Sequence, residues 1–185
     1  MLRLHRGEKK IAIVVEEGVE LLQRYLPKRA TPSEVEPVEA LYLLYTEAAR
    51  LYDEQGRMLN FEQLMRMLTI LNPYAWVEFE VYLDLRRRGR IPVPGPRSHT
   101  FLLRRSKRDT KYTHYILVLE ENRPVSLSLI NSFVEEALKN NWEPILAIVD
   151  RYGDITYYSV TLFHPQPART MQHAGENTSR TTQGI

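Results

Sequence analysis

Cysteine is absent from all 185 residues of the chain. Without it there are no disulfides, no cysteine-ligated zinc ribbons and no thiol nucleophile. A reducing cytoplasm is compatible with this composition, and so is a hot environment, in which thermolabile residues are thinned out.

Long hydrophobic runs are absent as well. No stretch reaches the roughly 20 consecutive apolar residues that a helix needs to span a bilayer. The N-terminal residues, MLRLHRGEKK, show no signal-peptide pattern. We therefore expect a cytoplasmic protein with no membrane association.

The usual signatures of metal and cofactor sites are also missing. The sequence has no HExxH motif, no GxSxG motif, no P-loop and no GxGxxG fingerprint, so hydrolase, NTPase and dinucleotide-binding functions lack their usual signals. The histidines are scattered, and none pairs with another at metal-ligand spacing. They are His5, His99, His114, His164 and His173. We expect neither a metal nor a cofactor.

What the chain does contain is an ordinary globular composition, with 43% hydrophobic residues and a net charge of only +2. So small a charge does not indicate nucleic-acid binding, but two stretches are locally basic. Residues 86–90, RRRGR, either contact RNA phosphates or end a helix in solvent, and the helix dipole favours the second reading. Residues 104–111, RRSKRDTK, lie in a predicted loop or hairpin, where RNA contact and plain solvation are equally consistent with the charges.

The first part of the chain predicts a small domain of mixed helix and strand over residues 1–72. The run Lys10–Val15, KIAIVV, is typical of a strand. Residues 31–34, TPSE, carry a helix-start signal in which the Thr caps the helix and the Pro takes its first position. Asn60, with Gln63 three residues later, repeats the capping pattern ahead of another helix.

Residues 73–164 predict a second domain of antiparallel strands and one main helix. A strand rich in aromatic and β-branched residues covers Lys111–Leu119, and the run Ile145–Val149 is typical of a buried strand. Between them Ser126 is placed to cap a helix. The apolar stripe of that helix is Ile130, Phe133, Val134, Ala137 and Leu138.

The last residues complete the fold prediction. ITYYSVTLF, residues 155–163, is the final strand, and residues 165–185 have no periodicity and little apolar content, so we expect a flexible tail. The fold class is α/β in the broad sense, with the α+β arrangement of helices and strands.

His114 is the histidine that we consider as a possible general base. Period-2 alternation predicts that it shares a strand face with Tyr112 and Ile116. A histidine among aromatic neighbours is more often a packed or half-exposed strand residue than a general base, and we favour that interpretation.

Six segments stand in a characteristic order: EALYLLY, GRMLNFEQL, VYLDLRRRGRIPVPG, YILVL, an amphipathic helix, and LAIVDRYGDITYYSV. From about Val35 to Val160, this order and spacing resembles the archaeal tRNA-splicing endonuclease family. The resemblance implies a restriction-endonuclease-like second domain with a mixed sheet. It also implies an activity, the metal-independent cutting of precursor tRNA at bulge-helix-bulge introns by a Tyr, a His and a Lys.

The three catalytic positions of that family hold other residues here. Its Tyr closes a strand after a Gly-rich turn, and that position falls on Arg104 or Arg105 in GPRSHTFLLRR. Its His opens a strand as HxxYLV, which corresponds to Tyr112 in YTHYILV, although a slip of two residues would bring His114 there. Its Lys precedes LLLAIVD, which corresponds to Trp142 in WEPILAIVD. Since Trp cannot offset the charge of a phosphorane, the resemblance implies a chain without the triad.

This pattern predicts a non-catalytic structural subunit that works on precursor tRNA with a catalytic endonuclease subunit, as an αβ pair doubled to a tetramer. The resemblance implies partner contacts along the last strand, through Tyr157 and Val160, where an edge of alternating apolar residues is a template for strand addition. It also implies docking by the hairpin loop DRYGD, through Asp150, Tyr152 and Asp154. The alternative for the loop is a plain turn in which the Asp residues serve turn geometry.

Two other functions stay open. One is a stand-alone RNA-binding module that uses the two basic stretches, with Arg104, Arg105 and Lys107 as the expected contacts. Such a module would bind RNA alone, with a steep salt dependence. The other is an active nuclease with a rearranged site at Tyr112 and His114, which would lack a charge-stabilising cation.

Overall fold

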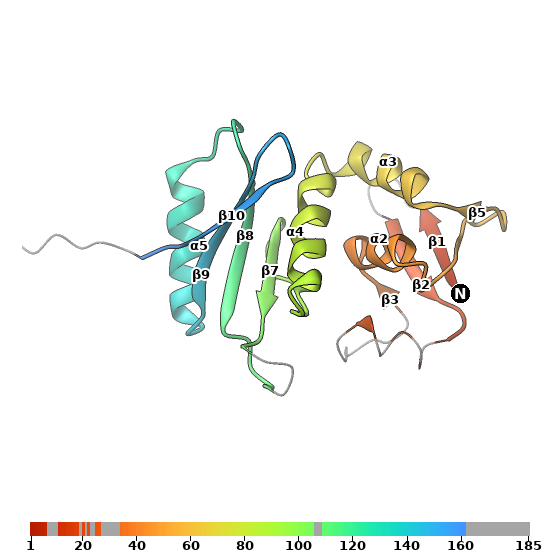
Figure 1. The fold of residues 1–185 in the computed structure, drawn as a ribbon, viewed down its shortest axis with the longest axis horizontal. Coiled ribbons are helices and arrows are strands. Elements are labelled where there is room, and N and C mark those ends of the chain that lie inside the picture. The colour runs from red at the N-terminus through yellow and green to blue at the C-terminus, as the bar shows by residue number, and fades with distance from the viewer. Residues whose placement is uncertain are drawn as a thin grey trace, which may run out of the picture.

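A computed structural model describes residues 1–6, 11–18, 20, 22, 25–26, 34–105 and 109–161. Its centre is helix α4 (Ala75–Arg87), which lies between an N-terminal part with one five-stranded sheet and a C-terminal part with another (Figure 1). No helix among the described residues is long and apolar enough to cross a membrane. The predicted tail at 165–185 lies outside these residues.

The N-terminal sheet has the strand order β3-β2-β1-β4-β5, with β1 antiparallel to β2 and parallel to β4. Its strands are β1 (Leu2–Arg6), β2 (Ile11–Val15), β3 (Glu34–Val35), β4 (Leu51–Tyr52) and β5 (Met58–Leu59). The strand predicted at Lys10–Val15 is β2, which confirms it. The sequence analysis did not predict β1, whose only local signal is the alternation of buried Leu2 and Leu4 with polar residues.

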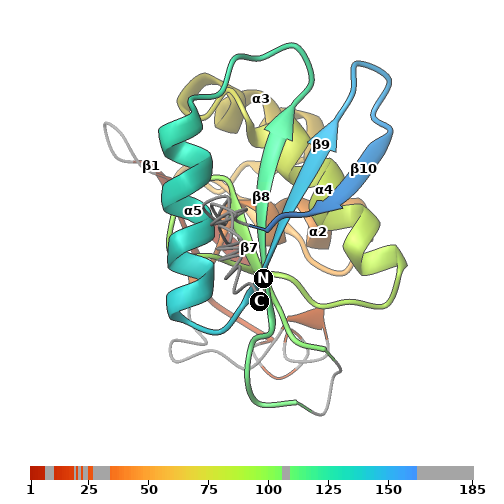
Figure 2. The same ribbon diagram turned by 90° about the vertical axis from the view of Figure 1, so that its left-hand side faces the viewer.

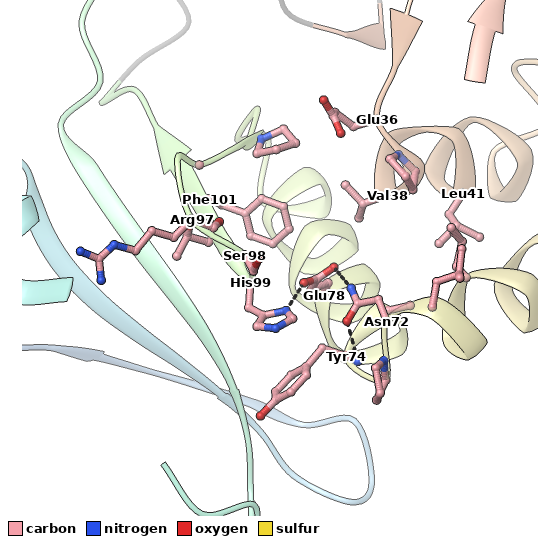
Figure 3. Close-up of a pocket in the computed structure, with 18 of the residues that line it drawn as sticks. Glu36, Val38, Leu41, Asn72, Tyr74, Glu78, Arg97, Ser98, His99 and Phe101 are labelled. Carbon is pink, nitrogen blue, oxygen red and sulfur yellow. Dashed lines mark hydrogen bonds and ion pairs between the residues drawn. The ribbon is translucent and has the colours of Figure 1, made fainter. Parts of the chain in front are cut away.

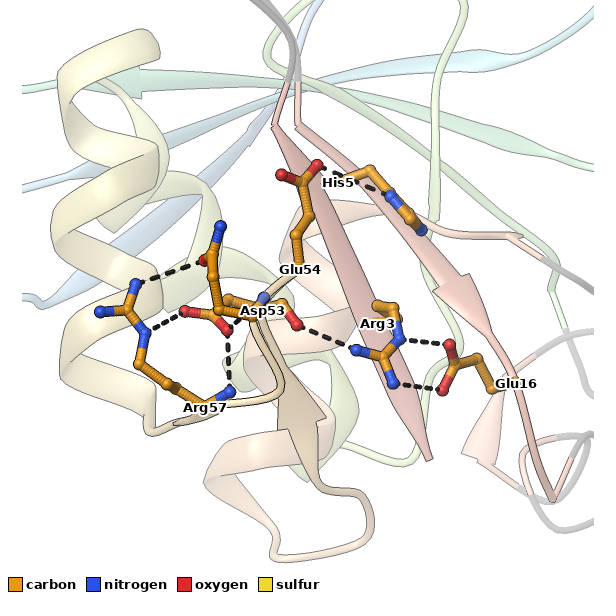
Figure 4. Close-up of polar contacts among 7 residues, drawn as sticks. Arg3, His5, Glu16, Asp53, Glu54 and Arg57 are labelled. Atoms are coloured by element: carbon orange, nitrogen blue, oxygen red, sulfur yellow. Dashed lines mark hydrogen bonds and ion pairs between the residues drawn. The ribbon is translucent and has the colours of Figure 1, made fainter.

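Polar contacts tie β1 to the hairpin of β4 and β5 (Figure 4). The Arg3 guanidinium forms an ion pair with Glu16 and donates to the carbonyl of Asp53 over 3.0 Å. The carboxylate of Asp53 in turn accepts from Arg57 Nε over 2.7 Å. The hydrogen bonds from Arg3 also hold the pKa of Glu16 below its usual value. One arginine therefore connects a strand to two segments that are distant in sequence.

The two helices that follow begin at residues with clear caps. Helix α3 (Phe61–Leu71) starts as predicted: Asn60 Oδ1 accepts from the Gln63 backbone over 2.9 Å, and Gln63 Oε1 accepts from the Asn60 backbone over 2.9 Å. The start predicted at residues 31–34 is wrong, because β3 follows and helix α2 (Pro37–Tyr45) begins only at its proline. Proline lacks an N–H and is tolerated in the first turn of a helix, so the second proline sets the boundary.

Helix α4 is buried around most of its circumference because both of its sides pack against other elements. Phe79 and Tyr82 are fully buried, and the side toward the N-terminal part packs against α2 and α3. The opposite side packs against the C-terminal sheet. One apolar cluster thus extends from β1 through α4 to Val149, across the residues 72 and 73 at which we predicted a domain boundary.

The C-terminal sheet has the order β10-β9-β8-β7-β6, in which β8 and β9 are parallel and the other neighbours are antiparallel. Helix α5 connects the parallel pair and covers one face, while α4 lies against the other face (Figure 2). The predicted α+β fold with a mixed sheet and one main helix is confirmed. The antiparallel arrangement predicted from the strand pattern is wrong for β8 and β9, because α5 returns the chain to the end at which β8 began. The elements are β6 (Val93–Pro94), β7 (Thr100–Leu103), β8 (His114–Glu120), α5 (Leu127–Lys139), β9 (Glu143–Val149) and β10 (Ile155–Ser159).

Helix α5 is held against the sheet by a narrow apolar stripe. The Ser126 hydroxyl caps it by accepting from the Leu129 backbone over 3.2 Å, as predicted. Phe133, Val134 and Ala137 are buried. Ile130 is partly buried and Leu138 is 53% exposed, so three of the five predicted stripe residues are fully buried.

Candidate functional site

Three strand ends meet at one edge of the C-terminal sheet. Strand β7 ends at Leu103, which pairs with His114 at the start of β8, and His114 pairs with Glu143 at the start of β9. Residues just beyond these three positions are therefore brought together although the sequence separates them. Arg104, Tyr112 and Trp142, the residues that we predicted at the family's three catalytic positions, all lie there.

Arg104 and Tyr112 form a stacked pair at this edge. The guanidinium carbon of Arg104 lies 5.2 Å from the centre of the Tyr112 ring, within the range of a cation–π contact. Tyr112 itself packs against the apolar cluster between the sheet and α5. The ring therefore contacts both the apolar cluster and the Arg104 guanidinium.

Trp142 packs against the same cluster as Tyr112. Its ring centre is 5.3 Å from that of Tyr115, a fully buried residue of β8. We predicted the family's lysine position at Trp142, but counting back along PILAIVD, residues 144–150, places it one residue later, at Glu143. Neither side chain brings a cation to this edge.

His114 does not join Tyr112, contrary to the prediction that the two share a strand face. Tyr112 precedes β8 and packs on the α5 side, whereas His114 alternates onto the face of Ile116, which packs on the α4 side. His114 Nε2 lies 3.5 Å from a carboxylate oxygen of Glu143, and its Nδ1 lies 2.8 Å from the Thr113 hydroxyl. Sequence reasoning missed Glu143 as the neighbour of His114, because that contact depends on the pairing of β8 with β9.

The first basic stretch is largely engaged within the chain. Arg86 stacks on the Tyr42 ring at 4.4 Å, Arg87 donates to the Tyr45 hydroxyl, and Arg88 pairs with Asp84 over 2.7 Å. These contacts agree with the interpretation of residues 86–88 as a helix end rather than a free cationic surface.

Arg90 connects the two basic stretches. Its guanidinium donates to the backbone carbonyl of Arg105, so that Arg90, Arg104 and Arg105 lie near one another at the same edge of the sheet. The side chain of Arg105 is exposed. Lys107, the third predicted RNA contact, lies outside the described residues.

The loop between β9 and β10 is a tight turn built on one carboxylate. Asp150 Oδ1 accepts from the backbone of Tyr152 over 2.8 Å and from that of Asp154 over 2.9 Å. Gly153 takes a left-handed conformation with φ of 87°, which glycine adopts at little cost. Asp150 thus serves turn geometry, while Tyr152 is 74% exposed.

Strand β10 is an edge of the sheet, paired only with β9 among the described residues. Tyr157 faces inward: its hydroxyl donates to Asp84 Oδ2 of α4 over 2.7 Å, and Arg88 lies over its ring. Burial and this hydrogen bond raise the pKa of Tyr157. Val160 packs against the cluster on the α5 side. Tyr158 is the exposed aromatic residue of β10, at 53% exposure.

A cleft of about 760 Å³ lies between the two parts of the chain (Figure 3). In its wall His99 Nδ1 lies 2.5 Å from Glu78 Oε1, and Asn72 donates to the other oxygen of that carboxylate over 3.0 Å. The ring of Tyr74 stacks on His99 at 4.2 Å. These contacts attach the turn before β7, which carries His99, to Glu78 of α4. Among the described residues there is no group of three or more acidic or histidine side chains that could hold a metal ion.

Comparison with known proteins agrees with this geometry. Residues 75–157 match the family model described as tRNA intron endonuclease, catalytic C-terminal domain. A tRNA-splicing endonuclease of Methanococcus vannielii is 30% identical over 159 residues, covering 83% of this chain and 90% of the relative. One from Methanococcus maripaludis gives the same identity and coverage, and one from Pyrococcus horikoshii is 30% identical over 66% of this chain and 72% of the relative.

The chain therefore belongs to the tRNA intron endonuclease family. The family predicted from the order of the sequence motifs is confirmed.

Proposed function

We propose that this chain is the non-catalytic, structural subunit of a tRNA-splicing endonuclease that cleaves precursor tRNA at bulge-helix-bulge introns. A catalytic subunit of the same family supplies the triad, in an αβ pair doubled to a tetramer. The observation that carries this proposal is the meeting of Arg104, Tyr112 and Trp142 at one sheet edge, since these are the residues that we predict at the family's three catalytic positions.

These three residues cannot replace a Tyr, a His and a Lys in the transfer chemistry. A guanidinium carries N–H donors and no acceptor, so Arg104 cannot remove a proton from a ribose hydroxyl. Trp142 is neutral and cannot stabilise a phosphorane. Of the other titratable side chains nearby, His114 lies on the other face of the sheet, beside the Glu143 carboxylate. An acid, a base and a cation are therefore not assembled in one place.

The partner surface that we propose is the free edge of β10 together with the turn at 150–154. The backbone of an edge strand offers unpaired donors and acceptors to a second chain. Of the residues that we expect to contribute, Tyr157 and Val160 act by setting the position of the strand, since both pack within the chain. Tyr152 and Asp154 are exposed and available to a partner.

Asp154→Lys tests the turn without removing its internal hydrogen bonds, because the structure uses only backbone atoms of Asp154 there. We expect weaker assembly with the catalytic subunit in size-exclusion chromatography and an unchanged unfolding midpoint. Asp150→Lys is the matched variant that also breaks the turn. An intact complex with Asp154→Lys would exclude docking through this loop.

A cleavage assay tests the proposal as a whole. A bulge-helix-bulge RNA is incubated in EDTA with this chain alone, with the catalytic subunit of the same cell alone, and with both. The proposal predicts cleavage that requires the mixture or is strongly increased by it. Cleavage by this chain alone would refute the non-catalytic role and would direct attention to Tyr112 and His114.

A stand-alone RNA-binding module is the second candidate, and the contact of Arg90 with the Arg105 carbonyl favours it, because it brings one arginine of the first basic stretch beside the second. The two candidates differ in what the chain does by itself. A module binds RNA tightly without a partner and with a steep salt dependence. A structural subunit binds weakly alone and is recruited to RNA through the catalytic chain.

A further inference from the structure

We infer that the exposed side of helix α4 around Trp76 and Glu80 receives an arginine of the partner subunit, which stacks on the indole and pairs with the carboxylate. This inference rests on the proposed function, because it names the chemistry of one contact in the complex. It goes beyond that function by placing the contact on α4, outside β10 and the turn at 150–154.

Three aromatic side chains come to the surface where α4 meets the ends of two other helices. Trp76 is 49% exposed, Tyr45 at the end of α2 is 47% exposed, and Phe61 at the start of α3 is partly buried. Their ring centres lie 6.3, 5.8 and 4.9 Å, in that order, from the ring centre of the buried Phe79. The core therefore holds these rings in place. Exposed aromatic residues of this kind are enriched among the dominant contacts of protein interfaces.

A carboxylate without a counter-ion lies one helical turn from Trp76. Glu80 is partly buried, and it forms no hydrogen bond or ion pair with another described residue. Loss of water raises the pKa of its carboxyl above the usual value, and the charge of Arg87 offsets part of that effect. A partly desolvated carboxylate gains from a cation, and a partner chain can supply one.

The pairing of an aromatic ring with a carboxylate selects arginine. Side chains four positions apart on a helix lie side by side, so Trp76 and Glu80 are presented to the same ligand group. A planar guanidinium stacks on an indole and also forms two parallel hydrogen bonds with a carboxylate, which a lysine ammonium cannot do. Arg87 does not take this place, because it lies roughly 10 Å further along the helix axis and donates to the Tyr45 hydroxyl over 3.0 Å.

The stripe leads to the surface that we propose for the partner. Trp76, Glu80 and Asp84 follow one another at intervals of four residues along α4. Asp84 accepts from the Tyr157 hydroxyl of β10 over 2.7 Å. The exposed side of α4 is therefore continuous with β10, and a chain that pairs with the edge of β10 can also cover Glu80 and Trp76.

The first measurement follows the exposure of Trp76 in the complex with the catalytic subunit of the same cell. The chain has two tryptophans, so Trp142→Phe leaves Trp76 as the only one. This variant is produced with 5-hydroxytryptophan, which is excited at longer wavelengths than the tryptophans of the partner. Acrylamide quenching is compared for the chain alone and for the complex isolated by size-exclusion chromatography. We expect the quenching constant to fall by about half or more, because the interface excludes water from a ring that is 49% exposed.

The second measurement is the Kd of the complex, with the native Trp142 retained. Glu80→Gln should weaken assembly about tenfold, since it keeps the shape and removes the charge from the hydrogen bonds. Trp76→Ala should weaken it roughly thirtyfold, as for a truncated aromatic hot spot. The matched control is Glu135→Gln, an exposed glutamate on α5, which should leave Kd within about twofold.

Each failure has a distinct signature. A complex in which Trp76 is quenched as strongly as in the free chain would overturn the inference and leave the proposed function standing. A Kd for Glu80→Gln equal to that of Glu135→Gln would exclude the ion pair. Protection of Trp76 that grows with the concentration of this chain alone would assign the surface to a second copy instead. A wild-type chain that forms no complex with the catalytic subunit would overturn the proposed function together with the inference.

Discussion

Removing the Tyr157 hydroxyl should destabilise the chain, whereas removing that of the adjacent Tyr158 should not. Tyr157 donates to Asp84 over 2.7 Å, and the two residues are 73 positions apart. A hydrogen bond to a charged acceptor contributes about 1.5–3 kcal/mol net. The Asp84 side chain is 25% exposed and keeps its ion pair with Arg88, so water and Arg88 compensate for part of the loss. We therefore expect Tyr157→Phe to cost about 1.5 kcal/mol, near the lower end of that range.

The assay is equilibrium unfolding in urea, with equal m-values required for comparison. Tyr158→Phe is the matched control, since Tyr158 is 53% exposed and its hydroxyl has no hydrogen-bond partner among the described residues. It should change the free energy of unfolding by less than about 0.5 kcal/mol. A double-mutant cycle with Asp84→Asn should return a coupling of about 1 kcal/mol.

Equal losses in the two phenylalanine variants, or no coupling to Asp84, would refute the reasoning. Strand β10 would then not be fastened to α4 through this hydrogen bond, and Tyr157 would be free to meet a partner directly.

The remaining predictions concern pH, a cap and a glycine. Burial and the hydrogen bond to Asp84 raise the pKa of Tyr157. The stability contributed by the neutral hydroxyl is therefore complete below the pKa of an unfolded tyrosine, about 10, and is lost as the pH rises further. Above pH ~10 the urea midpoint should fall less steeply in Tyr157→Phe than in wild type. Asn60→Ala removes the side-chain cap of α3 and should cost about 1 kcal/mol, measured as a lower thermal midpoint; an unchanged midpoint would mean that the cap is replaced by water. Gly95→Ala would place a Cβ 2.3 Å from the Thr100 hydroxyl and 3.1 Å from the Tyr115 ring. The free energy of unfolding in urea should therefore fall by about 1–3 kcal/mol. An unchanged free energy would show that the turn before β7 can shift to accommodate the methyl group.

Much of the fold could be predicted because its signals are local. The capping box of Asn60 and Gln63 and the cap at Ser126 act over three residues, so the sequence carries them completely. The apolar periodicity of α5 likewise identifies its buried stripe. The start of α2 was misplaced because two prolines, Pro32 and Pro37, both carry a helix-start signal, and the pairing of Val35 with β2 decides between them.

The candidate site was likewise predictable only in part. From the sequence alone we could predict which residues stand at the family's catalytic positions, and hence that a Tyr, a His and a Lys are missing there. The sequence could not show that Arg104 lies on Tyr112, or that Arg90 reaches the Arg105 carbonyl, because these contacts join strand and helix ends through the sheet.

The sequence by itself determined the caps of α3 and α5, the order of the main elements of the C-terminal part, and the chemical identity of Arg104, Tyr112 and Trp142. Only the tertiary structure decided which side chains meet. Tyr157 and Tyr158 are adjacent on a strand and equally apolar, yet one is held by a carboxylate 73 residues away and the other is left facing outward. A strand's alternation separates its two faces, but which face is buried depends on the layer that packs against it.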